Sequence, residues 1–367
     1  KYFDLVSGLA VTNIGHRHPK VMEAIYNQLE KHMHVMPYGE FVQKPQALLA
    51  KKLAEILPGN LNTSYFVNSG AEAVEGALKL ATRYTGRQEI LSCNKSYHGS
   101  THGALSVTGN ETKKNAFKPM LPNVTFIDFN VISDLEKITT STACVIIETV
   151  QGDAGVRIPS KDYMLALRSK CTETGTLLIL DEIQTGFGRT GTFFAFEQFK
   201  ITPDILCIAK AMGGGMPMGA FVSSNEIMSS LKENPMLGHI TTFGGHPVPC
   251  AAAVANIEVL QSDNLINEVE AKGRLIKELL THPIVKEIRQ IGLMLAIDLK
   301  DDETTQKVVE GCLAKGAITF WFLSCPASFR LAPPLTITFD ELKEACGIIT
   351  GVFDEVLGKA KGVYLHL

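Results

Sequence analysis

The sequence predicts an α/β fold in which a mostly parallel sheet is followed by a smaller α+β domain. Short apolar runs alternate with amphipathic helical patterns through the middle of the chain, an order typical of a parallel sheet covered on both faces. After about Leu265 the pattern changes to a charged helix over Asn267–Leu280, a hairpin in IRQIGLMLAIDL, and mixed helix and strand pieces. The length of 367 residues also suits two domains.

Each element of this fold is expected from its own periodicity. Apolar residues recur at helical spacing over Pro19–His32, Lys44–Ile56, Ala71–Tyr84, Lys161–Thr174 and Pro247–Leu260. Apolar runs suited to buried parallel strands lie at Ser64–Val67, Glu89–Ser92, Ala143–Ile147, Thr176–Leu180, Ile205–Ile208 and Gly219–Val222. The first residues, KYFDLVSGLAVTNIGHRHP, predict a strand that enters a turn, and not a signal or transit peptide.

Composition argues against several classes of function. A net charge of −3 offers no electrostatic basis for binding nucleic acid or an anionic membrane. The eight cysteines include no CxxC pair, which is typical of buried thiols in a reducing cytosol. No apolar run approaches the roughly 18 residues of a membrane span. We therefore expect a cytoplasmic protein with no nucleic-acid or membrane partner.

Three of the predicted strands end on charged residues. ACVII is followed by Glu148, TLLIL by Asp181 and ILCIA by Lys210. Because the carboxyl ends of parallel strands share one edge of the sheet, these side chains are expected to converge where ligands bind. A salt bridge that closes the sheet edge would explain any one of them. All three together favour a functional site.

The segment YFVNSGAEAVEGALKL predicts a strand, a turn and a helix, and two interpretations of the turn stay open. Ser69 and Glu72 have the spacing of a capping box, which by itself would explain both residues. Alternatively, the amides of Ser69, Gly70 and Ala71 lie at a helix N-terminus, which is suited to binding an anion.

Other motifs give weaker indications. GFGRTG matches GxGxxG, but it does not follow its strand directly and opens no clean helix, so a Rossmann site is not expected. No GxxxxGK[ST] motif occurs. The histidine pairs 16/18, 32/34 and 98/102 lack a third metal ligand and are expected in loops or caps. Ser69 and Ser100 have no GxSxG setting.

Several motifs together resemble one family. DEIQTGFGRTG at Asp181 and PDILCIAKAMGGGMPMGA at Pro203 are similar to the class III (ω-type) aminotransferases, which depend on pyridoxal phosphate. So are SGAEA, YHG, ETVQGDAG, TTFGGHP and FRLAPPL, in the same order over nearly the whole chain. The resemblance implies the fold-type I architecture, with a mostly parallel seven-stranded sheet in the large domain. It also implies that a short piece of the family pattern precedes Lys1.

The resemblance assigns roles to individual residues. Lys210 would carry pyridoxal phosphate as a Schiff base and act as general acid/base, and Asp181 would hold a proton on the pyridine nitrogen. Thr242 would reach the phosphate from a second subunit, which implies a homodimer with shared active sites. The implied cofactor-binding residues are Ser69, Gly70, Ala71, Tyr97, His98, Glu148, Asp181, Ile183, Gln184, Lys210 and Thr242.

The implied substrates are an amino donor and a 2-oxo acid, commonly 2-oxoglutarate, in a ping-pong cycle. Arg330 matches the arginine that binds an α-carboxylate, and Asp153 stands where relatives often have a glutamate that pairs with it. Ser100 stands where many relatives have an arginine. Thr241 completes the implied substrate-binding set.

The core motifs look most like the acetylornithine/ornithine branch, whose activity belongs to arginine biosynthesis. Alternatives are an aminotransferase for another diamine or ω-amino acid, such as 4-aminobutyrate or diaminobutyrate, and a pyridoxal-phosphate aminomutase or decarboxylase. Outside this chemistry, a nicotinamide-dependent dehydrogenase using GFGRTG and an inactive binding protein stay open. The expected domains are an N-terminal segment 1–44 packing with the small domain, a large cofactor-binding domain 45–262, and a small domain 263–367.

Overall fold

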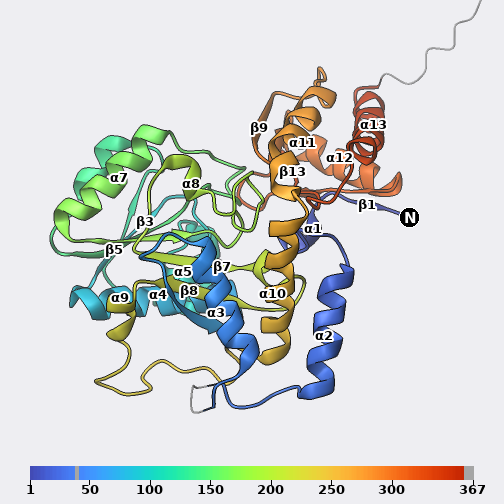
Figure 1. Ribbon diagram of the computed structural model, residues 1–367. Helices are drawn as coiled ribbons and strands as arrows, with labels where there is room; N and C mark the ends of the chain where they lie inside the picture. Colours follow the sequence, from blue (N-terminus) through green and yellow to red (C-terminus); the bar gives the residue numbers. More distant parts are fainter. Residues whose placement is uncertain (38–40, 359–367) are drawn as a thin grey trace, which may run out of the picture.

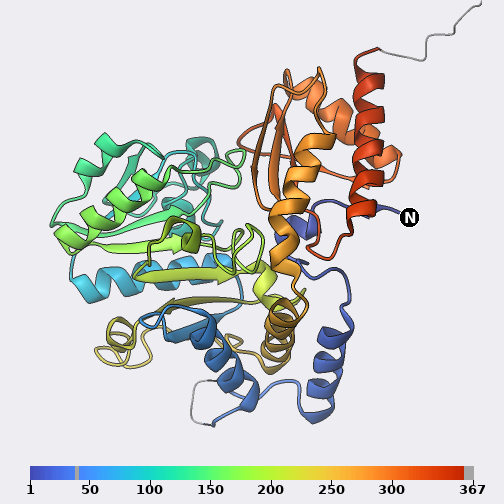
Figure 2. The same ribbon diagram turned by 45° about the horizontal axis from the view of Figure 1, so that its top comes forward.

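The computed structural model describes residues 1–37 and 41–358. A sheet-bearing part, with helices above and below it, lies beside a smaller part formed by the C-terminal third of the chain (Figure 1). Seen from a second direction, α10 (Pro247–Ser262) and α11 (Leu265–Leu279) connect the two parts (Figure 2). No helix in the described part of the chain is long and apolar enough to cross a membrane.

The larger part contains the predicted mostly parallel seven-stranded sheet. Its strand order is β2-β8-β7-β6-β5-β3-β4. The strands are β2 (Thr63–Val67), β3 (Glu89–Cys93), β4 (Val124–Ile127), β5 (Thr142–Glu148), β6 (Leu177–Asp181), β7 (Ile205–Ala209) and β8 (Gly219–Ser223). The sequence analysis did not predict β4. Its prediction that Gly219–Val222 is parallel is wrong, because β8 runs antiparallel to both β2 and β7.

The central strands have no solvent face, which explains their continuous apolar runs. Every residue of β5, β6 and β7 is buried. Alternate residues of β5 enter different clusters: Cys144 and Ile146 pack with α4 (Gly70–Thr85), whereas Val145 and Ile147 pack with α7 (Lys161–Thr174) and α10. The sheet is therefore the middle layer of three.

The remaining helices follow the predicted pattern closely. Helices α2 (Pro19–Lys31), α3 (Lys44–Ile56), α4, α7 and α10 start and end within two residues of the predicted bounds. The shorter helices of the larger part are α5 (His102–Ser106), α6 (Glu111–Lys114), α8 (Phe196–Phe199) and α9 (Asn225–Ser229). The predicted N-terminal strand and turn are β1 (Phe3–Asp4) and α1 (Ser7–Ala10).

The smaller part is an antiparallel sheet with helices, as predicted. Its four-stranded sheet has the order β12-β13-β10-β9, and the predicted hairpin is β9 with β10. The elements are β9 (Glu287–Ile291), β10 (Met294–Asp298), α12 (Asp302–Ala314), β11 (Ala317–Ile318), β12 (Phe320–Trp321), β13 (Ser328–Leu331) and α13 (Phe339–Val356). The apolar stripe of α13 faces α11 and α12.

The predicted N-terminal segment contacts both parts. Strand β1 pairs in parallel with β11 of the smaller part, whereas α2 packs against α10 beside the large sheet. The domain boundaries at 44/45 and 262/263 stay a prediction. Residues 38–40 and 359–367 of the predicted N-terminal segment and small domain lie outside the described residues.

The GFGRTG segment joins the parts of the molecule together. It forms a loop after β6, and the buried Arg189 guanidinium donates to the carbonyl oxygens of Leu293, at 2.9 Å, and Pro333, at 2.6 Å. It also donates to the side-chain oxygen of Asn13. The motif therefore links the large sheet, the smaller part and the N-terminal segment, and these contacts account for it without a nucleotide.

Candidate active site

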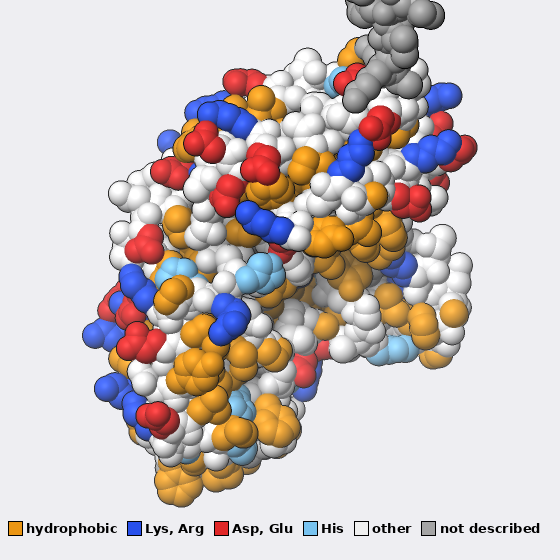
Figure 3. Space-filling model, turned by 90° about the vertical axis from the view of Figure 1, so that its right-hand side faces the viewer, with side chains coloured by type: hydrophobic (Ala, Val, Ile, Leu, Met, Phe, Trp, Pro, Cys, Tyr) orange, Lys and Arg blue, Asp and Glu red, His pale blue; other side chains and the backbone are white. Residues whose placement is uncertain are grey.

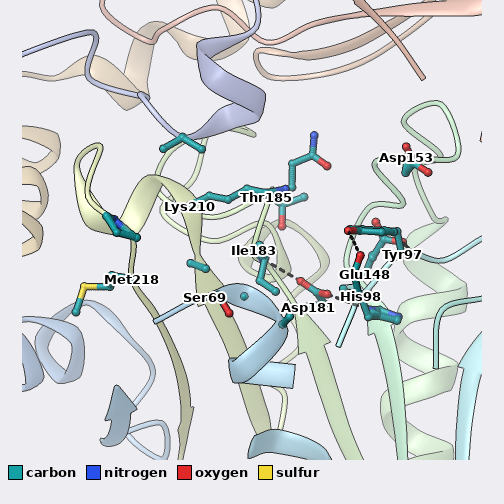
Figure 4. Close-up of a pocket in the computed structure, with 18 of the residues that line it drawn as sticks. Ser69, Tyr97, His98, Glu148, Asp153, Asp181, Ile183, Thr185, Lys210 and Met218 are labelled. Carbon is teal, nitrogen blue, oxygen red and sulfur yellow. Dashed lines mark hydrogen bonds and ion pairs between the residues drawn. The ribbon is translucent and has the colours of Figure 1, made fainter. Parts of the chain in front are cut away.

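A cavity of about 590 Å³ lies at the carboxyl ends of the central strands. Glu148 and Asp181 are register partners at the ends of β5 and β6, and Lys210 follows β7 directly. All three line the cavity, as Figure 4 shows. The predicted convergence of these three strand ends is confirmed, since parallel neighbours deliver their last residues to the same edge.

The position of Lys210 favours the neutral form of its amine. It is the first residue of the short 3₁₀ helix Lys210–Gly213 and has a left-handed φ of 48°. Burial lowers the pKa of its amine, while Asp181 and Glu148 act in the opposite direction and Arg330 in the same one. A buried lysine without a contacting carboxylate gives up its proton more readily than one in water.

Asp181 is fixed by two contacts within the protein. Its Oδ2 lies 2.7 Å from Nδ1 of His98, and its Oδ1 accepts a hydrogen bond of 3.0 Å from the Ile183 amide. His98 is itself buried, and its Nε2 has no hydrogen-bond partner among the described residues. The histidine therefore orients the Asp181 carboxylate, and both side chains line the cavity.

Glu148 is a buried carboxyl group whose two oxygens each accept a hydrogen bond from a backbone amide. Its Oε1 accepts from the Tyr97 amide at 3.0 Å, and its Oε2 accepts from the Gly152 amide at 2.8 Å. Burial raises its pKa to about 7, although His98 and these amides oppose the shift. Glu148 thus holds together the loops that carry Tyr97 and Asp153.

The N-terminus of α4 opens onto the same cavity. Ser69 caps the helix by accepting a hydrogen bond from the Glu72 amide at 3.2 Å. The predicted capping box is wrong in one half, because Glu72 accepts from the amide of Asn68, at 2.7 Å, and not from that of Ser69. Gly70 and Ala71 line the cavity, and their amides belong to the first turn, which has no intrahelical partner.

A space beside the helix N-terminus depends on the absence of a side chain at Gly70. A Cβ there would lie 2.8 Å from the Ile183 side chain, which lines the cavity between α4 and Asp181. Gln184 also lines it and touches the backbone at Gly152, where a Cβ would lie 2.1 Å from its Oε1. Tyr97 forms another wall, and its hydroxyl lies 3.2 Å from Ser100 Oγ.

The predicted carboxylate-binding arginine lies against Asp153. Arg330 is buried on β13, and its Nη2 is 3.4 Å from Oδ1 of Asp153, which lines the cavity. The guanidinium lies over the Phe322 ring at 4.3 Å. Burial lowers the pKa of Arg330, and Asp153 opposes this shift.

Thr241 and Thr242 do not line this cavity. Thr241 accepts a hydrogen bond of 2.9 Å from Asn68, and Thr242 is exposed. Several residues at or near the site were not predicted, among them Asn68, Thr185 and Met218 of the cavity wall and Lys113 behind it. The buried Thr185 lines the cavity and lies beside Lys210 (Figure 4). Lys113 contacts Asp153, and no sequence signal points to it because its partner is remote in the chain.

The histidine pairs form no metal site in the described part of the chain, where no three His, Cys, Asp or Glu side chains are placed to share an ion. His16 pairs with Asp4 and His98 with Asp181. His98 lies in the loop between β3 and α5, as expected, and from there it contacts Asp181.

Comparison with known proteins decides the family. The model of the family described as aminotransferase class III matches residues 1–353. The chain belongs to the class III aminotransferases. It is 41% identical over 348 residues to the acetylornithine aminotransferase of Methanopyrus kandleri, covering 94% of this chain and 88% of that relative.

Solved structures of class III aminotransferases share its fold. An (S)-enantioselective ω-transaminase from Thermomicrobium roseum superposes with a TM-score of 0.90 at 32% identity, over 97% of this chain and 89% of the other. The ornithine aminotransferase of Toxoplasma gondii is described with pyridoxal phosphate at its active site. It superposes with a TM-score of 0.90 at 30% identity, over 98% of this chain and 87% of the other. This aminotransferase is therefore a pyridoxal-phosphate-dependent transferase of the EC 2.6.1 type with the fold-type I architecture.

The residues of this aminotransferase fit that cofactor. An amine with a lowered pKa, a buried carboxylate on the neighbouring strand and a helix N-terminus open onto one cavity. These groups match an aldehyde, a pyridine nitrogen and a phosphate. A buried polar atom without a partner among the described residues, Nε2 of His98, belongs to the same site.

Proposed function

We propose that this aminotransferase transfers an ω-amino group, of the acetylornithine or ornithine type, to 2-oxoglutarate by a ping-pong mechanism. The observation that carries the proposal is the meeting of Lys210, Asp181 and the α4 N-terminus with the Arg330–Asp153 pair in one place. The 41% identity to an acetylornithine aminotransferase supports the donor class. An acetylornithine donor would place the chain in arginine biosynthesis.

The protein's own residues would divide the work as follows. Pyridoxal phosphate, when bound, withdraws electrons from the substrate carbon that carries the amino group. Asp181, oriented by His98, would hold a proton on the cofactor's ring nitrogen, and Gly70 and Ala71 would bind its phosphate. Lys210 would hold the cofactor and move the proton at the substrate carbon, because its lowered pKa lets the amine accept and return a proton.

The remaining predicted residues would surround the ring. Ile183 would pack against one face and Tyr97 against the other, while Gln184 would hydrogen-bond the ring hydroxyl. Glu148 would act through the loops that it holds. Arg330 would bind the α-carboxylate of the 2-oxo acid as a bidentate fork.

A second candidate is transfer from another diamine or ω-amino acid. Ser100 favours it, because a hydroxyl cannot replace a guanidinium in binding a substrate carboxylate. Ser100 also lies within 3.2 Å of the Tyr97 hydroxyl, so the pair is a neutral wall of the cavity. A donor with no carboxylate at that end would meet no unpaired charge there.

We also propose a homodimer in which Thr242 reaches the phosphate and Thr241 the substrate of the partner's site. Hydrophobic side chains gather on the face that carries α2 (Figure 3). The exposed large apolar side chains of α2, the segments that flank it and residues 236–243 are Tyr26, Leu29, Met33, Met36, Phe41, Val42, Met236, Leu237, Ile240 and Phe243. Such a surface is typical of an obligate interface. A cytoplasmic location fits the eight free cysteines.

One experiment tests cofactor, lysine and donor together. The purified protein with added pyridoxal phosphate should show a long-wavelength absorption band that borohydride removes, and Lys210→Ala should lack it. Lys137→Ala, which removes another paired lysine, should retain the band. Bleaching by acetylornithine but not by 4-aminobutyrate supports the first donor class, and the reverse supports the second. A protein that stays colourless would refute the proposal.

A further inference from the structure

We propose that Lys113 is a positioning residue that holds Asp153 partly away from Arg330, and so keeps Arg330 available to the carboxylate of the 2-oxo acid. The inference rests on the proposed function, since it concerns the recognition of that substrate. Lys113 lies on α6, which belongs to the large sheet's side of the cavity, whereas Arg330 lies on β13 of the smaller part.

The two oxygens of Asp153 have unequal partners. Oδ2 lies 2.9 Å from Lys113 Nζ and also accepts a hydrogen bond of 2.6 Å from Ser324 Oγ. Oδ1 has only the long contact of 3.4 Å to Arg330 Nη2. Charge-assisted hydrogen bonds between nitrogen and a carboxylate are ordinarily about 2.7–2.9 Å long. The carboxylate is therefore held mainly by Lys113 and Ser324.

Lys113 is itself held in place. Its amine lies 4.9 Å from the centroid of the Tyr97 ring, and its side chain is 24% exposed. Asn110, the N-cap of α6, donates a hydrogen bond of 3.2 Å to Ser324, so both donors to Asp153 belong to one connected group. A side chain restrained in this way fixes its partner better than a free surface lysine.

The charges near Arg330 do not cancel. One carboxylate faces two cations, and all three side chains are at most 24% exposed. Burial acts to raise the pKa of Asp153, but Ser324, Lys113 and Arg330 outweigh it and the pKa lies below its ordinary range. The group as a whole carries an excess positive charge. Arg330 Nε has no partner among the described residues, so the guanidinium still has donors to offer.

Removing Lys113 would change this balance. Asp153 would then face Arg330 alone, and the two would neutralise each other across a short, poorly hydrated gap. A substrate carboxylate would have to displace Asp153 before it could bind. The opposing model is direct: Lys113 itself contacts the substrate carboxylate and compensates for the absence of arginine at Ser100. The amine of Lys113 is already engaged by Asp153 Oδ2, at 2.9 Å, which favours the indirect role.

The test measures the binding of glutarate, an unreactive dicarboxylate, to the cofactor-loaded enzyme by calorimetry. Lys113→Gln should weaken glutarate binding about five- to tenfold, an ordinary size for coupling between neighbouring sites. It should also raise KM for 2-oxoglutarate without lowering kcat. Lys113→Arg should restore both values. The matched control Lys137→Gln removes a lysine–aspartate pair of similar length, 3.0 Å, and should bind glutarate as the wild type does.

A double variant separates the two models. With Asp153→Asn as the background, no carboxylate competes for Arg330, so adding Lys113→Gln should change glutarate binding by less than twofold. A loss as large as in the wild-type background would overturn the proposal, because Lys113 would then act on the ligand directly. An unchanged affinity in Lys113→Gln alone would overturn it as well.

Two further readouts keep the test decisive. The visible cofactor band is recorded first, so a failure of the proposed function appears in the wild type as a missing band and not as an altered glutarate affinity. If Lys113→Gln does not fold, Ser324→Ala carries the test. It removes the other donor to Asp153 Oδ2 and should weaken glutarate binding about two- to threefold, with no change counting against the proposal.

Discussion

Gly219 lets β8 pack closely against the turn that begins α4. A methyl group added there should push the strand and the turn apart. Gly219 is the first residue of β8 and pairs with Val67 on one side and Ala209 on the other. It therefore separates the strand that leads into α4 from the strand that leads into Lys210. A Cβ at this position would lie 2.4 Å from the carbonyl oxygen of Ser69.

The size of the effect follows from that distance. Ordinary contact begins at 3.4 Å, so in Gly219→Ala the N-cap of α4 must retreat by about 1 Å. The overlap is with backbone, which cannot rotate away, and the strain should lower the free energy of unfolding by about 1–3 kcal/mol. Misplacement by about 1 Å in a preorganised site commonly costs up to a hundredfold. We expect pyridoxal phosphate to bind about ten- to a hundredfold more weakly.

The assay is titration of the apoprotein with pyridoxal phosphate, followed by visible absorbance, with a thermal melt of each apoprotein. Gly213→Ala is the matched control, because a Cβ there meets nothing closer than 3.6 Å and should leave the affinity within about twofold of the wild type. A Gly219→Ala protein that melts at a lower temperature but binds the cofactor with wild-type affinity would refute the link between β8 and the proposed phosphate site at the N-terminus of α4.

Four further outcomes are expected. Asp181→Asn should retain the fold but lower kcat at least a hundredfold, because the carboxylate held by His98 loses its charge; an equal kcat would contradict its role. The rate of cofactor attachment should rise with pH and level off below the ordinary lysine pKa, since burial lowers that of Lys210. The pKa of Glu148 is raised to about 7 by burial, so the folded state retains a proton that the unfolded state loses; apoprotein stability should fall as pH rises from about 4.5 to 7, and less so in Glu148→Gln. Gly347→Ala, in open space on α13, should stabilise the protein by about 0.5–1 kcal/mol in chemical denaturation.

Local patterns in the sequence were sufficient for most of the large sheet. Buried strands with helices between them produce long apolar runs and clear periodicity, and α2, α3, α4, α7 and α10 were predicted to within two residues at each end. Lys210 and Asp181 stood out because a charge directly after a buried strand is costly unless it is used. Their convergence follows from parallel strand order alone.

Contacts between remote segments were decided only by the tertiary structure. Strand β8 is antiparallel to both of its neighbours. An apolar run does not reveal whether its strand is parallel or antiparallel to the others, so the sequence could not predict this direction. Even within four residues the turn decides the partner, because Glu72 accepts from the amide of Asn68 although the spacing predicts that of Ser69. In each case the sequence specifies the group, and the folded backbone decides its partner.

The same division applies to the site. The sequence by itself determined most of the long helices and buried strands, the lysine and the carboxylate, because these depend on burial patterns within a few residues. Three sets of contacts join segments 40 to 177 residues apart. They pair His98 with Asp181, Arg189 with Pro333, and Asp153 with both Lys113 and Arg330. Only packing brings such groups within hydrogen-bonding distance, because a short-range electrostatic contact leaves no periodic trace in the chain.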